Sequence, residues 1–327
     1  MTVRNLHYRA RVACLRSLTA CGLGAVFQRN RSGRRLINYH GVDERGSTQY
    51  NGRFISRASL EQHLAYFTRH FNVVTLTDYL EGAWHAEKLT VCLTFDDGYR
   101  NNLKHVLPLL EKYQAPASFF VTAVAAMGRD TLWPDRLDLT TALSQRSIEI
   151  DGETFRKSAG GAYVSERGTL KQLCVTGGDV FSVQAERALA QVLDLKAHPE
   201  LAEYWQLMTQ EEIRTLSESP LVTVGSHGVS HCSFEHVSRD VAREEMQRSK
   251  TWLEDVTGKE VNVFAYPFGH YTRENLDDAE ALGFTHQLAL DFRRPEDEQD
   301  PRLYGRFGVN PYIEWDLQLI FMLNGRY

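Results

Sequence analysis

An apolar run that ends in two adjacent carboxylates and a glycine constrains this chain more than any other feature. Leu89 to Leu93 is short and rich in β-branched residues, which predicts a buried strand. Asp96, Asp97 and Gly98 follow at its end. Successive side chains of a strand point to opposite faces, so both carboxylates can reach one site if the chain turns at Gly98. Such a pair suits a hydrolase in which one carboxylate binds a cation and the other transfers a proton. The alternative is a structural role, in which Asp-Asp-Gly only caps a loop.

A second apolar run leads to two histidines. Leu221 to Val224 predicts another strand, and His227 and His231 follow it with small residues between them. Side chains four residues apart lie on one side of a helical or turn-like path, so both rings can face one ion. A hydrogen-bonded structural histidine is the alternative for each ring. Two histidines and one carboxylate would leave positions open for water and substrate.

These motifs occur in a recognisable order with two others. The segments are Asn38 to Val42, Thr94 to Gly98, Ser226 to His231, and Phe264 to Gly269. Together they resemble the polysaccharide deacetylase family, also called the NodB-homology group or carbohydrate esterase family 4. Tyr39 and His40 resemble the start of its Tyr-His-x-Val subgroup. The resemblance runs from about residue 36 to the C-terminus and implies an irregular (β/α) barrel.

The predicted elements agree with that fold class. Strand and helix patterns alternate from residue 36 to residue 121, which is typical of a parallel α/β architecture. The alternation is lost at about 124–208, a length that indicates an insertion. We therefore expect an N-terminal amphipathic helical segment over 1–35 and a NodB-like domain over 36–327. Trp133, in the insertion, is a candidate sugar platform, and a core residue of the insertion is the alternative.

The resemblance also implies roles for the motif residues. Asp96 is implied as the general base, and Asp97, His227 and His231 as the ligands of a divalent metal. The segment Tyr266, Pro267 and Phe268 is implied to contact the substrate, with the backbone N–H of Phe268 facing the oxyanion. Zinc is the first expectation for the metal, and cobalt, nickel or manganese also suit two histidines and one carboxylate.

The sequence departs from the family pattern at two places. Many members carry an arginine that supports the base where this chain has Ala265, so another cation must support Asp96 or its basicity is tuned differently. The late histidine that protonates the leaving group in many members is also missing. His40, at the end of the first predicted strand, is our candidate for the general acid, and His286 is the alternative.

Composition limits the partners and the compartment. The 327 residues carry a formal net charge of −5, so no global field favours nucleic acid. Five cysteines without paired spacing favour a reducing compartment. The basic N-terminal segment has an apolar stripe interrupted by Arg16 and no clear cleavage site. We expect a cytoplasmic protein with peripheral membrane contact through that segment as an option, and a periplasmic location is the alternative.

The function expected from these observations is metal-dependent removal of an acetyl group from an N-acetylated sugar of a polysaccharide or glycolipid. Two alternatives stay open. The scaffold also suits an amidohydrolase that cleaves a non-sugar C–N bond. A non-catalytic carbohydrate-binding relative is the other alternative, because the supporting arginine and the late histidine are both missing from their usual places.

Overall fold

The computed structural model describes residues 12, 17 and 32–325. The amphipathic helix expected over 1–35 lies almost wholly outside these residues, so it stays a prediction. Among the described residues, no helix combines the length and the apolar character needed to cross a membrane.

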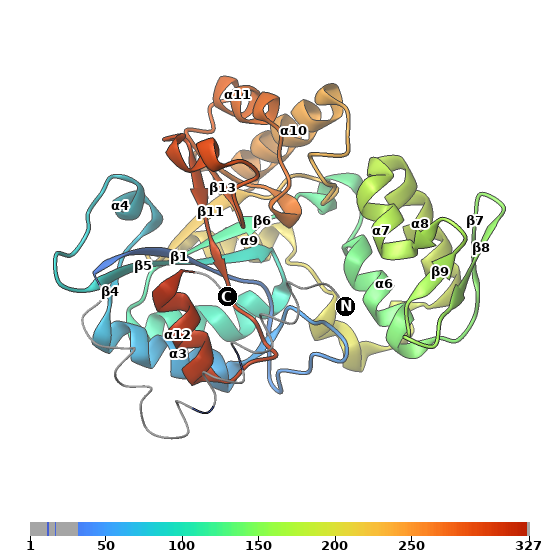
Figure 1. The fold of residues 1–327 in the computed structure, drawn as a ribbon, viewed down its shortest axis with the longest axis horizontal. Helices are drawn as coiled ribbons and strands as arrows, with labels where there is room; N and C mark the ends of the chain where they lie inside the picture. The colour runs from blue at the N-terminus through green and yellow to red at the C-terminus, as the bar shows by residue number, and fades with distance from the viewer. Residues whose placement is uncertain (1–11, 13–16, 18–31, 326–327) are drawn as a thin grey trace.

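The centre of the molecule is a nearly closed parallel β-barrel, as the sequence predicted (Figure 1). Neighbouring strands follow the order β14-β13-β12-β11-β6-β5-β1-β15, and every pairing is parallel. Only Arg306 separates β14 from β15, so one chain segment pairs with β13 on one side and with β1 on the other. The strands are β1 Gly33–Tyr39, β5 Leu89–Asp97, β6 Ala117–Val121, β11 Val222–Ser226, β12 Val263–Ala265, β13 His286–Ala289, β14 Leu303–Gly305 and β15 Phe307–Gly308.

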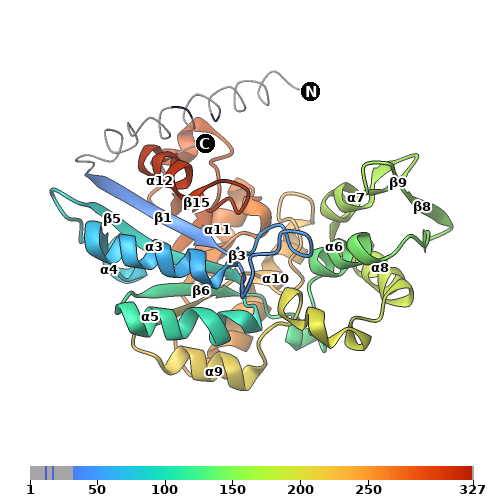
Figure 2. The ribbon, with the colours of Figure 1, turned by 90° about the horizontal axis from the view of Figure 1, so that it is seen from below.

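Helices cover the outside of the barrel, and short elements fill in at its ends (Figures 1 and 2). A capping box formed by Thr209 and Glu212 fixes the start of α9. Pro108 stands in the first turn of α5, directly after a π-helical turn, where its missing N–H costs no helical hydrogen bond. The elements are α3 Arg57–His70, α4 Leu76–Leu80, η1 Asn102–Val106, α5 Leu107–Tyr113, α9 Gln210–Glu218, α10 Arg239–Thr257, η5 Pro267–Gly269, α11 Arg273–Ala281, η6 Pro295–Gln299, α12 Trp315–Asn324, and the short strands β2 Val42–Asp43, β3 Ile55–Ser56 and β4 Asn72–Val73.

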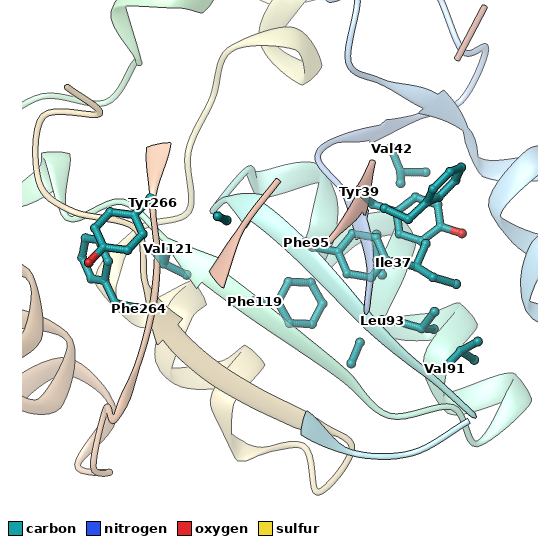
Figure 3. Close-up of a cluster of buried hydrophobic side chains, with 14 of the residues drawn as sticks. Ile37, Tyr39, Val42, Val91, Leu93, Phe95, Phe119, Val121, Phe264 and Tyr266 are labelled. Atoms are coloured by element: carbon teal, nitrogen blue, oxygen red, sulfur yellow. The ribbon is translucent and has the colours of Figure 1, made fainter. Parts of the chain in front are cut away.

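The central strands are buried on both faces, which explains their continuous apolar runs. All nine residues of β5 are buried. Phe95 stacks on Tyr39 and on Phe119, with ring centroids 5.1 Å apart in each pair, in the cluster drawn in Figure 3. The alternate residues of β1 and β5, Asn38, Thr94 and Asp96, form a separate polar group. The polar residues of the strand ends are thereby held on a rigid apolar frame.

The insertion, Val124 to Met208, forms a compact unit beside the barrel (Figure 1). Its own hydrophobic cluster includes Trp133, Ile148, Phe155 and Leu189. Figure 2 shows it beyond the end of the barrel toward which the β1 arrow points. Its elements are η2 Val124–Met127, α6 Trp133–Leu143, the antiparallel sheet of β7 Ile148–Ile150, β8 Glu153–Lys157, β9 Tyr163–Ser165 and β10 Gly168–Thr169, α7 Leu170–Thr176, α8 Gly178–Val192, η3 Leu195–Ala197 and η4 Pro199–Tyr204.

A buried histidine makes the stability of this fold sensitive to acid. His63 of α3 is 5% exposed, stacks on Trp315 with ring centroids 4.3 Å apart, and shares a hydrogen bond with the Tyr39 hydroxyl. Burial lowers the pKa of His63 from 6.5 to about 3. Its contribution is therefore fully present above pH 6.5 and is lost as the pH falls toward 3, because the unfolded chain binds the proton first.

We expect His63→Gln to reduce the pH dependence of the unfolding free energy between pH 6.5 and 4. The wild-type slope should include up to about 1.4 kcal/mol per pH unit from this one proton. Urea unfolding at stepped pH values measures the slope, and His85→Gln, at an exposed histidine, is the matched control. An unchanged slope in His63→Gln would contradict this explanation.

Candidate active site and metal centre

The three central motifs converge at the carboxyl edge of the barrel, and each contains a strained residue. Asp97 has a φ of 77°, His231 one of 55° and Phe268 one of 60°. Five non-glycine residues have positive φ in the described part of the chain, and three of them are in these motifs. The chain therefore turns at Asp97 itself and continues through Gly98, so Asp96 and Asp97 reach one site from different directions, as the sequence required. Such clustered strain points to a functional site.

Asp97, His227 and His231 form a buried group with the donor set of a metal centre. Asp97 Oδ1 lies 3.5 Å from His227 Nε2 and 3.2 Å from His231 Nε2. One ligand atom from each residue lies within 4.8 Å of the other two. Asp97 Oδ1 is buried and has no hydrogen-bond partner among the described residues. A buried acceptor without a donor, facing two imidazole nitrogens, fits a divalent cation.

Contacts behind the histidines orient the His227 ring and the loop between the two residues. His227 Nδ1 donates to the Ala265 carbonyl over 2.7 Å, so its Nε2 is left with a lone pair for the site. The Glu245 carboxylate accepts from the backbone N–H groups of Val229 (2.7 Å) and Ser230 (2.9 Å), between the two histidines. Burial lowers the pKa of His231, which keeps that ring neutral at pH 7. Neutral imidazoles are the form that binds metal.

Arg306 supplies a cation beside Asp96, which is one of the two possibilities that Ala265 left open. Its Nη1 donates to Asp96 Oδ1 over 2.7 Å and its Nη2 to Oδ2 over 2.8 Å. Asn38 Nδ2 also donates to Oδ2, over 3.1 Å. Burial acts to raise the pKa of Asp96, but Arg306, His227 and His40 outweigh it and lower that pKa. The Asp96 carboxylate is therefore held charged and oriented, and its role as general base stays a prediction.

His40 lies directly after β1 at the same edge of the barrel. Burial lowers its pKa to about 4, against the opposing charges of Asp97 and Asp96, so the ring is neutral at pH 7. His286 is the first residue of β13, at the opposite edge from the strand ends, and its Nδ1 shares a hydrogen bond with Thr285. Of the two candidates for the general acid, only His40 lies among the site residues.

Two of the expected substrate contacts have side chains in the core. Tyr266 is fully buried, and its hydroxyl donates to Gln287 Oε1 over 2.5 Å, so its side chain does not face the site. Trp133 is 2% exposed and its Nε1 donates to the His231 carbonyl over 3.2 Å. The core interpretation of Trp133 fits this burial, and the sugar platform does not. The Phe268 ring, in contrast, packs edge-on against His231 with centroids 4.7 Å apart.

A second polar network joins Asp97 to the insertion and was not anticipated from the sequence. Arg53 forms an ion pair with Asp97 Oδ2 (3.3 Å) and with Asp135 of α6. The Tyr99 hydroxyl donates to both Asp135 oxygens, over 2.9 and 3.0 Å. Burial raises the pKa of Asp135 to about 7, although Arg53 opposes the shift. These residues lie far apart along the chain, so no local spacing could have revealed them.

Comparison with solved structures shows a shared fold. The chain is similar to a de-N-acetylase from Aggregatibacter actinomycetemcomitans (17% identity, TM-score 0.54, covering 88% of this chain and 99% of that one). It is also similar to IcaB from Ammonifex degensii (21%, 0.55, 89% and 97%). A third is the Streptococcus pyogenes deacetylase PplD in complex with acetate (18%, 0.53, 89% and 97%). No curated protein matches the chain.

The family is shown by a sequence match rather than by these distant structures. The sequence model of the polysaccharide deacetylase family matches residues 85–157 and 181–286, which together are more than half of the chain. The matched region includes Asp96, Asp97, His227 and His231, and within the insertion it leaves out only residues 158–180. The barrel and the buried His-His-Asp group agree with that match. This chain belongs to the polysaccharide deacetylase family, a NodB-homology family of hydrolases.

Proposed function

We propose that this protein is a metal-dependent deacetylase that removes the acetyl group from an N-acetylated sugar of a polysaccharide or glycolipid. The observation that carries the proposal is the buried Asp97, His227 and His231 group beside a separately supported carboxylate, Asp96. One acid and two histidines would bind the ion, and the second acid remains available for proton transfer. We keep zinc as the first expectation for the ion.

The chain's own residues divide the work of hydrolysis. A bound divalent ion would polarise the acetyl carbonyl and lower the pKa of the attacking water. Asp96, held by Arg306 and Asn38, would accept a proton from that water. The ring of Phe268 packs on His231, which supports its motif as the wall that faces the acetyl group. His40 would protonate the leaving amine, and because its ring is neutral at pH 7 it has to gain a proton during turnover.

The decisive experiment is acetate release from a panel of N-acetylated and O-acetylated glycans. We expect protein stripped of metal by a chelator to be inactive, and zinc or cobalt to restore release, because no described residue donates a hydrogen bond to Asp97 Oδ1. Release of ammonia or urea from non-sugar amides, without acetate release, would favour the amidohydrolase. A protein that binds both ion and glycan but releases nothing would contradict a catalytic role.

A His40→Gln sample in the same panel tests the acid. An amine is a poor leaving group and needs a proton, whereas a nitrophenolate does not. We therefore expect His40→Gln to lose far more activity on an N-acetylated sugar than on p-nitrophenyl acetate. Equal losses on both substrates would remove His40 from this role.

A further inference from the structure

Asp97 has two carboxylate oxygens with different surroundings. Oδ1 faces His227 Nε2 and His231 Nε2 and has no hydrogen-bond donor among the described residues. Oδ2 accepts from Arg53 Nη1 over 3.3 Å. A carboxylate pinned at one oxygen cannot rotate freely, so the contact with Arg53 determines which oxygen is presented between the histidines.

Arg53 is in turn held by groups from two separate parts of the chain. Its Nε donates to Asn51 Oδ1 over 3.2 Å, and its Nη2 pairs with Asp135 Oδ1. Asp135 is fully buried and also accepts from Asn51 Nδ2 (2.8 Å) and from the Tyr99 hydroxyl. Because Asp135 lies on α6, the orientation of Arg53 depends on the insertion.

The charges of this chain of contacts also matter. A guanidinium beside a metal ligand repels a divalent ion, and it withdraws charge from the carboxylate that it binds. Asp135, whose carboxylate is fully buried, offsets the positive charge of Arg53, whose side chain is 25% exposed. The contacts from Asp97 through Arg53 to Asp135 are expected to tune the affinity of the centre for a divalent ion, because residues behind metal ligands orient them.

We propose that Arg53, held by Asp135 of the insertion, is a positioning residue that presents Asp97 Oδ1 to the divalent ion, so that the insertion sets the ion affinity of the centre. This inference rests on the metal centre of the proposed function. It gives the insertion a role at the reacting end of the barrel that is separate from any contact with substrate.

The test is ion affinity itself, measured on the full chain by competition between the protein and a chromogenic chelator for zinc. Arg53→Met gives the decisive sign. A guanidinium that acted only as a charge would repel the ion, so its loss would tighten binding. A positioning guanidinium predicts the reverse, about 10- to 100-fold weaker binding. Asp135→Asn should weaken binding about tenfold, because Arg53 loses its countercharge. The visible spectrum of the cobalt-loaded protein reports altered ligand geometry independently of activity.

Two further variants distinguish a loss of ion binding from poor folding of Arg53→Met. Arg53→Met/Asp135→Asn leaves neither charge buried alone, and we expect it to keep the weak binding. Glu186→Gln breaks a comparable buried ion pair, with Arg129, inside the insertion and away from Asp97, and we expect wild-type affinity. Wild-type or tighter binding in both Arg53 variants would overturn the inference, as would equal weakening by Glu186→Gln.

A failure of this inference can be distinguished from a failure of the proposed function. Weak ion binding in the Arg53 variants, with no acetate release by any sample, would support the positioning role and reject the deacetylase. Acetate release by the wild type, with unchanged affinity in all variants, would reject the positioning role alone.

Discussion

Replacing Asp96 with asparagine is expected to lower the rate of acetate release by about 10²- to 10⁴-fold, the usual contribution of a general base. The variant should still bind its divalent ion, because Asp97, His227 and His231 are unchanged. The measurement is kcat on an N-acetylated glycan, with the bound metal counted in the same sample. A variant that releases acetate at the wild-type rate would mean that Asp96 is not the base.

The control has to separate catalysis from stability, because Asp96 is also half of a buried ion pair. Asp297→Asn is suitable. Asp297 is 1% exposed and accepts from the Tyr271 hydroxyl (2.8 Å) and from Arg273 (3.2 Å), and it is not among the site residues. We expect this variant to be less stable but to keep the wild-type kcat.

Arg306→Met should lower the free energy of unfolding by about 3–5 kcal/mol, because it leaves the Asp96 carboxylate buried without its countercharge. The Arg306 side chain is fully buried and makes two hydrogen bonds to that carboxylate. Chemical denaturation measures the loss. The pKa of Asp96 should also rise, since Arg306 is the main group that lowers it, and activity should fall at low pH.

Two comparisons test whether the loss comes from leaving a buried charge without its partner. Arg239→Met removes an arginine that is 60% exposed from its ion pair with Asp278, and it should cost less than about 1 kcal/mol. The double variant Asp96→Asn/Arg306→Met leaves no unpaired charge, so it should be more stable than the sum of the single losses implies. Strict additivity would show that the two side chains do not stabilise each other.

The fold could be predicted from the sequence wherever local patterns are strong. The apolar run before Asp96 predicts β5. Asp151 and Gly152, a pair typical of a hairpin turn, both have positive φ between β7 and β8. The two strands that join β13 to β1 could not be predicted individually, because β14 and β15 have only three and two residues. The start of helix α11 at Arg273 does not follow from apolar spacing, since a capping box formed by Thr272 and Asn275 determines it.

The same distinction holds for the candidate site: residues in local motifs could be predicted, and residues that only the tertiary fold brings together could not. Asp96, Asp97, His227 and His231 stand in compact motifs, and the structure brings them together. The need for a cation beside Asp96 could also be predicted, but not its identity, because Arg306 lies 210 positions further along the chain. Arg53 and Asp135 left no signal at all. Arg53 is 44 positions from Asp97 and 82 positions from Asp135, and only the folded barrel and insertion bring the three residues together.

The break between β14 and β15 has a consequence for the order in which the molecule can assemble. Arg306 reaches Asp96 only when this last segment enters between β13 and β1. Until then a ribosome-bound or partly folded chain carries an unneutralised carboxylate on a strand that is otherwise ready to be buried, which disfavours premature collapse around it. Entry of the β14–β15 segment and neutralisation of the Asp96 carboxylate are therefore one event, so a chain in which this segment has not entered the barrel also lacks the Asp96–Arg306 ion pair.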